Sequence, residues 1–173
     1  MVMKQDVVFD NVLDLAAYLN ETMANPTLVT LNKALYFLWG FYAGSFGNLT
    51  DSPDTTANEL LSFPAMLFEP KFIKRDYGPV LEQVNEAYAK KILPKMKARA
   101  LQKQMHLNTL GKKNVQGFLD NLIKQMKQVD EYSLMLHAKK DPAVKQTMLN
   151  QLIDPSAIKA EYVKQVERQL GSD

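Results

Sequence analysis

The sequence predicts a mainly α fold, arranged as a single compact helical domain over residues 1–173 with at most a small strand element near residues 66–77. Apolar residues recur at helical spacing along most of the chain, most densely over residues 30–44. Prolines and helix-capping side chains separate these stretches, as is typical of the boundaries between successive helices. A chain of 173 residues, 46% of them hydrophobic, is long enough and apolar enough to bury one core.

The segment 30–44 is the predicted centre of the domain. Its apolar residues follow the i, i+3, i+4 and i+7 spacing of one helix face, namely Leu31, Ala34, Leu35, Leu38, Trp39 and Tyr42. Two phenylalanines add a second apolar edge, and a helix that is apolar nearly all round belongs inside a domain. We therefore expect Leu35, Leu38 and Trp39 to be largely buried.

Polar and small residues mark the limits of this central helix. Thr27 and Thr30 are both suitable caps for its N-terminus, and Gly44 and Gly47 suit its C-terminal end. Lys33 is the only charged residue within the helix, and it falls in the first turn. We expect its long side chain to carry the ammonium group to the rim of the domain.

The segments on either side of the centre predict further helices. A first helix runs to about residue 22, with Asp10 as its cap, and a turn-rich stretch over residues 45–64 holds a short helix near 56–61. Residues 66–77 mix aromatic residues with proline and lysine, so an extended segment or small hairpin is expected there. Pro79 is expected to open the next helix, because proline is favoured at the first helical position.

The C-terminal half is also predicted to be helical. Asn114 is the expected cap of a helix ending near residue 129, followed by a short helix over residues 132–138. Another helix is expected over residues 144–152. The last helix spans residues 154–171, where an aspartate and a proline stand together at the start.

No catalytic or metal-binding pattern is present in the sequence. The chain has no cysteine, which excludes disulfides, thiolate metal sites and cysteine nucleophiles. His106 and His137 lie far apart and in no metal-binding spacing, and no phosphate-binding glycine motif occurs. Ser45 lacks the spacing of a nucleophile elbow, and Glu82 and Glu86 are expected to lie on a solvated helix face. We therefore predict a protein that is not an enzyme and uses no cofactor or metal.

The net charge, the first residues and the length of the apolar runs predict the location and the partners of the protein. The net charge of +2 demands no polyanionic partner. The first residues contain no apolar core of a signal peptide, and the longest apolar run is shorter than the ~20 residues that span a bilayer. We expect a cytoplasmic protein with no membrane association.

One basic stretch leaves a second function open. Residues 87–119 contain no acidic side chain but include eight lysines and arginines. Clustered on one face, such residues bind phosphates, so a nucleic-acid-binding regulator that uses residues 90–113 is the alternative function. No recognition-helix motif accompanies this stretch, and a solvated basic face is the simpler explanation.

Three segments resemble a known family. Residues 31–42 are similar to a K-L-x-K-L-L-Y-F helix, with Lys33 on its second lysine and Tyr36 on its first aromatic position. Residues 68–80 end in Tyr-Gly-Pro-Val and are similar to a W-x-y-G-P-V block in which another residue replaces the tryptophan. Residues 134–145 are similar to an L-s-x-l-t-H-x-x-x-P-W ending, with valine in place of its tryptophan. Together they resemble the Panacea domain, a family of SocA-like antitoxins and phage-associated proteins, over residues 8–146.

The resemblance implies a non-catalytic function for the chain. Members of this family bind and neutralise a toxin encoded by a neighbouring gene, in some cases on a prophage, and the SocA type also delivers its toxin to a protease. The family fold is α-rich with a small strand element. The motif positions that carry over as candidate partner-binding residues are Lys33, Tyr36, Lys74, Arg75, Tyr77, Gly78, Pro79 and His137. Such a protein can use either side-chain anchors or strand addition to hold its partner.

Overall fold

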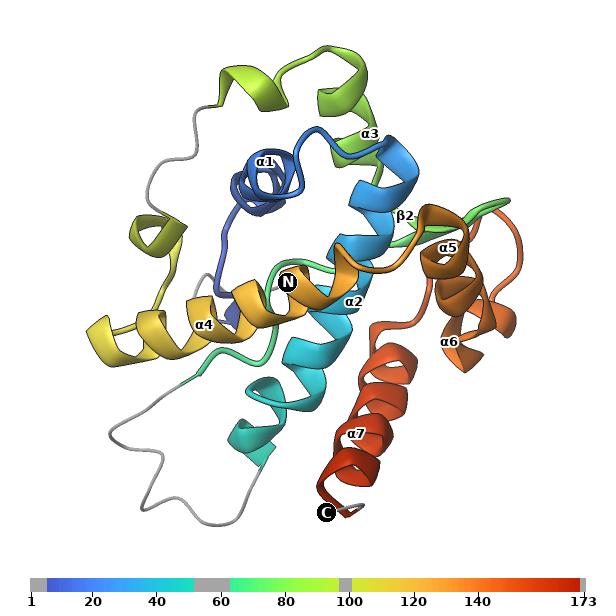
Figure 1. Cartoon of the computed structure of the whole chain (residues 1–173). Coiled ribbons are helices and arrows are strands. Elements are labelled where there is room, and N and C mark those ends of the chain that lie inside the picture. The colour runs from blue at the N-terminus through green and yellow to red at the C-terminus, as the bar shows by residue number, and fades with distance from the viewer. Residues whose placement is uncertain (1–5, 52–62, 97–100, 172–173) are drawn as a thin grey trace.

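The computed structural model describes residues 6–51, 63–96 and 101–171, and its fold is mainly α with one two-stranded sheet (Figure 1). The α-helices are α1 (Val12–Thr22), α2 (Leu28–Gly44), α3 (Glu82–Ala89), α4 (Thr109–Met126), α5 (Glu131–Lys140), α6 (Pro142–Lys145) and α7 (Pro155–Gly171). The short 3-10 helices are η2 (Gly47–Asp51), η3 (Leu93–Lys95) and η4 (Leu101–Gln104), and the strands are β1 (Ile73–Arg75) and β2 (Gly78–Val80). None of the described helices is both long enough and apolar enough to cross a membrane.

Helix α2 lies at the centre of the core, as the sequence predicts (Figure 1). Leu35 and Leu38 are fully buried, and Trp39 is 1% exposed. The side chain of Thr27 accepts a hydrogen bond from the backbone N–H of Thr30, which makes Thr27 the N-cap. Helices α1, α4, α5 and α7 and the hairpin all contact α2. The predicted burial of this helix is confirmed.

The C-terminal helix α7 packs closely along α2 because two glycines leave room for it. A Cβ atom on Gly40 would lie 2.6 Å from ring carbons of Tyr162, and one on Gly44 would lie 2.6 Å from the backbone carbonyl carbon of Tyr162. The Tyr162 ring also meets Phe41 edge to face, with the ring centroids 4.8 Å apart. The two helices therefore approach at a distance that side chains at these two positions would forbid.

The segment between residues 63 and 72 is fixed to the other side of the core by aromatic side chains of α2. Trp39 Nε1 donates to the backbone oxygen of Phe68 at 2.8 Å, and the Tyr42 hydroxyl donates to that of Pro64 at 2.8 Å. Both hydrogen bonds are buried. They satisfy the polar ends of two large apolar side chains and hold the extended chain that leads into the hairpin.

The expected strand element is a hairpin in which β1 and β2 pair antiparallel, with Ile73 opposite Val80 and Arg75 opposite Gly78. Its second strand lies beyond the expected region, and this corrects the assignment of Pro79. Pro79 is in β2, and the following helix α3 begins only at Glu82. The sheet forms there because α2 supplies hydrogen bonds to β2, as described below.

Residues 150–153 also differ from expectation. The predicted helix over 144–152 is wrong, because α6 ends at Lys145 and the later residues run beside β1. The backbone N–H of Lys74 donates to the oxygen of Gln151 at 3.0 Å, and that of Ile153 donates to the oxygen of Phe72 at 2.8 Å. The hairpin is therefore flanked by a third extended segment.

Helix boundaries account for the remaining corrections. Asn11, not Asp10, caps α1, and Asn108 caps α4, so that Asn114 lies inside α4 instead of starting it. The helices expected over 132–138 and 154–171 correspond to α5 and α7. The short helix expected near residues 56–61 lies outside the described residues.

Candidate partner-binding site

Strand β2 is joined to α2 by two consecutive side chains, Asn32 and Lys33. Lys33 Nζ donates to the carbonyl oxygen of Pro79 at 3.0 Å, and Asn32 Oδ1 accepts from the backbone N–H of Leu81 at 2.9 Å. In the antiparallel register, these backbone groups face away from β1. The edge of β2 is therefore satisfied by side chains of the central helix, and Asn32 also donates to Asn85 Oδ1 at 2.8 Å.

Lys33 is buried, so the expectation that its ammonium reaches the rim is wrong. Its side chain is 1% exposed, because the hairpin and α5 cover the first turns of α2. Burial, together with the nearby charge of Lys139, lowers the pKa of Lys33 from 10.5 to about 8, and burial is the larger cause. The ammonium group nevertheless has an acceptor in Pro79, which offsets part of the cost of burying it.

We call the contact between Lys33 of α2 and Gly78 and Pro79 of β2 the joint. Gly78 has a backbone φ of +104°, and a Cβ atom there would lie 3.2 Å from Lys33 Cε. Both conditions favour glycine. The same Cβ position lies 3.4 Å from Lys139 Cγ, which comes from α5. Lys33, Gly78 and Lys139 belong to the three separate segments that carry the family resemblance, and the structure brings these segments together around the base of the hairpin.

The eight predicted partner-binding residues divide into two groups around this joint. Lys33, Tyr36, Gly78 and Pro79 are buried and support the hairpin. Lys74 and Arg75 are half-buried, and Tyr77 and His137 are exposed, with His137 on α5. Their role in binding a partner stays a prediction, and only the second group is accessible to one in this arrangement.

Exposed apolar residues lie beside the accessible group, on the chain that follows α6. We call Arg75, Tyr77, Met148 and Leu149 the hairpin patch. Tyr77 is 62% exposed, Met148 77% and Leu149 50%. Lys74 Nζ donates to the Thr147 carbonyl at 2.9 Å and Arg75 Nη1 to Asn150 Oδ1 at 2.5 Å, so the two segments are fixed side by side.

The sequence does not single out Met148 and Leu149, because two adjacent apolar residues are unremarkable in the helix predicted over residues 144–152. In the structure Asn150 has a φ of +68°, which interrupts a helix and which asparagine tolerates well. Pairing with β1, which is distant in sequence, decides the structure of this segment.

Within the described residues, neither edge of this hairpin is free to pair with a strand from a partner. Residues 150–153 pair with the outer edge of β1, and Asn32 and Lys33 bind the outer edge of β2. Side-chain anchors therefore remain as the way in which the hairpin patch could hold a partner.

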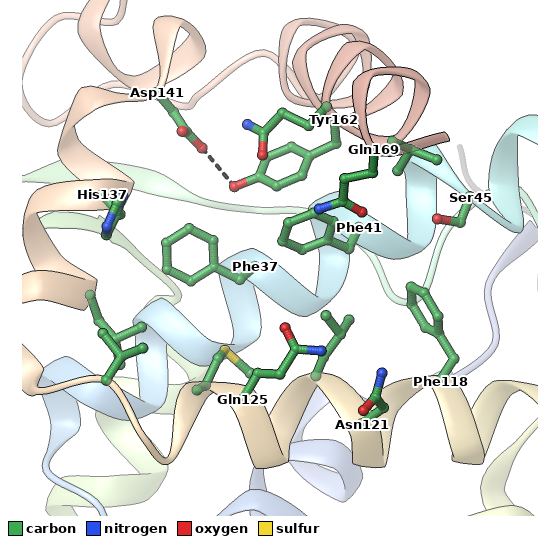
Figure 2. Close-up of a pocket in the computed structure, with 16 residues that line it drawn as sticks. Phe37, Phe41, Ser45, Phe118, Asn121, Gln125, His137, Asp141, Tyr162 and Gln169 are labelled. Atoms are coloured by element: carbon green, nitrogen blue, oxygen red, sulfur yellow. Dashed lines mark hydrogen bonds between the residues drawn. The ribbon is translucent and has the colours of Figure 1, made fainter. Parts of the chain in front are cut away.

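A second polar group lies between α2, α5 and α7. The Tyr162 hydroxyl donates to the carboxylate of Asp141 at 2.8 Å, as Figure 2 shows. Burial raises the pKa of the Asp141 carboxyl, while the hydrogen bond from Tyr162 acts in the opposite direction. The fully buried Tyr36 hydroxyl lies close to the same carboxylate but reaches hydrogen-bond geometry with no described residue.

The titratable residues considered in the sequence lie in separate places. His106 pairs with Asp10 at 2.7 Å, Glu82 with Arg75 at 2.7 Å, and Glu86 with Lys90 at 2.7 Å. All of these pairs are largely solvent-exposed. Among the described residues no three histidine or carboxylate side chains are grouped in a way that could hold a metal ion.

The basic stretch does not form one continuous helix in its described parts. Helix α3 ends at Ala89, η3 and η4 are short, and α4 begins at Thr109. Lys91 has a φ of +57°, which breaks the helical course of the chain between α3 and η3. The described lysines of residues 90–113 are therefore distributed over several elements, and nucleic-acid binding by them stays a prediction.

No family model, curated protein or solved structure matches this chain. The similarity of the three segments to the Panacea domain accordingly stays a prediction.

Proposed function

We propose that this chain is a non-catalytic protein-binding domain of the antitoxin type, which neutralises a toxin encoded by a neighbouring gene, including one on a prophage. The supporting observation is the joint formed by Lys33, Gly78 and Pro79, with Lys139 beside it, where the three segments that resemble the Panacea family meet. This joint supports a surface feature, the hairpin patch, whose composition suits contact with another protein.

The hairpin patch has the residue types that dominate protein interfaces. Tyrosine, arginine and methionine are enriched at the centres of such interfaces, and tyrosine and arginine are frequent binding hot spots. Tyr77 and Met148 are more than half exposed, so a partner would bury apolar area that is now in contact with water. Arg75 is also held by Glu82 at 2.7 Å, which limits the side-chain freedom that binding must remove.

The support beneath the patch favours a preformed surface over one that folds on binding. The hairpin is held from one side by α2 through Asn32 and Lys33, and from the other by residues 150–153. A rigid surface loses little conformational entropy when a partner docks. Neutralising a toxin requires only that such a surface covers the toxin's working site, and no reaction at this chain is needed.

The test is to co-express the chain with the neighbouring reading frame and to measure growth rescue and co-purification. We expect Tyr77→Ala combined with Met148→Ser to weaken binding by about 30-fold or more, the effect of losing about 2 kcal/mol at a hot spot. The matched control is Tyr132→Ala combined with Leu110→Ser, because these residues are 65% and 56% exposed and lie outside the patch.

A neighbouring product that is harmless alone, or that the wild-type chain neither rescues nor binds, would refute the antitoxin proposal itself. If wild type binds but both double variants bind equally well, the interface lies elsewhere and the hairpin patch is the part that fails. Delivery of the toxin to a protease would require a second surface that stays free in the complex.

A further inference from the structure

A cavity of about 520 Å³ is lined by side chains of α2, α4, α5 and α7, together with Asp141, which follows α5 (Figure 2). Its volume falls within the range of about 300–1,000 Å³ that is typical of sites for small organic ligands. In Figure 2, α4 forms one wall, α7 the other, and α5 closes one end. None of the proposals made for the hairpin patch uses this cavity.

Aromatic and apolar side chains supply most of the cavity surface. Phe37 and Phe41 come from α2, Phe118 from α4 and Tyr162 from α7. Phe37, Phe41 and Phe118 are only partly buried, although each packs against the core. The four faces surround a space that is apolar in its middle, and such a space favours a flat aromatic or a short alkyl group.

Charge is nearly absent from the cavity lining, with one exception at the end formed by α5. Of the lining residues only Asp141 carries a carboxyl, and His137 is the only basic side chain. The remaining polar lining residues are uncharged, namely Ser45, Asn121, Gln125, Gln165, Gln169 and the Tyr162 hydroxyl. A ligand that fits this lining is apolar along most of its length and polar at one end.

Among the described residues Asp141 has no lysine or arginine as an ion-pair partner, and His137 is the basic side chain whose charge acts on its carboxyl. Asp141 is 8% exposed. The Tyr162 hydroxyl is its hydrogen-bond donor, and the buried Tyr36 hydroxyl beside it is left without a partner. Buried carboxylates are usually paired with a cation, and no lysine or arginine fills that role for Asp141 among the described residues.

We propose that this cavity binds an organic amine, with the ammonium group paired to the Asp141 carboxylate and an aromatic or alkyl body between Phe37, Phe41 and Phe118. The ammonium group supplies the missing counter-charge and N–H donors. The phenylalanine rings add hydrophobic contact and attract a cation near their faces. A carboxylic acid of the same shape is rejected, because its charge would be repelled by Asp141.

The proposal is independent of toxin binding and is tested on the full chain alone. Isothermal titration at pH 7 compares three probes of one shape: 4-phenylbutylamine, 4-phenylbutanol and 4-phenylbutyric acid. We expect the amine to bind about 10-fold more tightly than the alcohol, as an additional charged hydrogen bond of about 1.4 kcal/mol implies, and the acid to bind most weakly.

Variants then locate the amine. Asp141→Asn keeps an acceptor for Tyr162 and removes the charge, so it should abolish the preference for the amine over the alcohol. Gln125→Lys changes an exposed residue of the lining and places a competing cation there, so it should weaken amine binding without disturbing the core. Glu167→Gln on the exposed face of α7 is the charge-matched control and should bind like wild type.

Equal affinity for all three probes, or no binding of the amine at millimolar concentration, overturns the proposal. Amine preference that survives in Asp141→Asn, or amine affinity that is unchanged in Gln125→Lys, overturns it as well. If Asp141→Asn fails to fold, Gln125→Lys alone decides the result, since its side chain lies at the surface of the cavity.

Discussion

Replacing Lys33 by methionine should change how the stability of the protein depends on pH. The pKa of Lys33 is lowered from 10.5 to about 8 in the folded chain, so the unfolded chain holds this proton more tightly. Between these two values the unfolded state binds more protons than the folded state, and stability therefore rises with pH. Below pH 8 both states hold the proton, and the full cost of burying the charge is present.

The size of this effect follows from the two pKa values. At about 1.4 kcal/mol per pKa unit, the Lys33 contribution to the free energy of unfolding should increase by about 2 kcal/mol between pH 7 and pH 9.5. Methionine has a similar shape and no titrating group, although it leaves the Pro79 carbonyl without its donor. The free energy of unfolding of the variant is subtracted from that of wild type at each pH. This difference cancels the titration of every other group that the substitution leaves undisturbed.

Urea unfolding of both proteins at several pH values across this range gives the required difference. The difference in free energy should shift in favour of wild type as the pH rises, and the shift should be complete only above the ordinary pKa of lysine. A difference that stays constant from pH 7 to pH 9.5 would show that Lys33 is not desolvated, and would refute the buried joint between α2 and β2.

Three further substitutions test the packing of the helices. Leu38→Ala removes a fully buried side chain and should lower the free energy of unfolding by about 2–5 kcal/mol in denaturant titrations; an unchanged midpoint would place α2 at the periphery. Gly44→Ala puts a methyl group 2.6 Å from the Tyr162 backbone and should destabilise the protein, whereas Gly117→Ala, with nothing within 4 Å, should stabilise it by about 0.5–1 kcal/mol. Thermal unfolding that ranks these two glycine variants the other way would contradict the close approach of α7.

The central helix could be predicted from the sequence because its information is local. Its apolar spacing over residues 30–44 and its cap at Thr27 lie within one stretch, and no distant contact is needed to choose the helix. The same holds for α7, where Pro155 marks the start. The start of α4 is less clear from the sequence, because Asn108 and Asn114 are both suitable caps, and only the structure shows that Asn108 accepts from the backbone N–H of Gly111.

The candidate site could be predicted only in part, because distant residues decide its structure. Pro79 is compatible with both the start of a helix and a strand, and hydrogen bonds from Asn32 and Lys33 select the strand. Residues 150–153 likewise become extended by pairing with β1. The sequence pattern contains neither of these contacts, so it could not show that Lys33 is covered or that Met148 is exposed.

The close packing of Tyr162 against Gly40 and Gly44 has a consequence for biosynthesis. The nascent chain leaves the ribosome with α2 about 110 residues ahead of α7, the helix that must cover it. At about 5–20 residues per second, that side of α2 waits roughly 6–20 s for its covering helix. During this interval the aromatic surface around Phe41 is available to chaperones, and the core can close only after translation has reached the last helix.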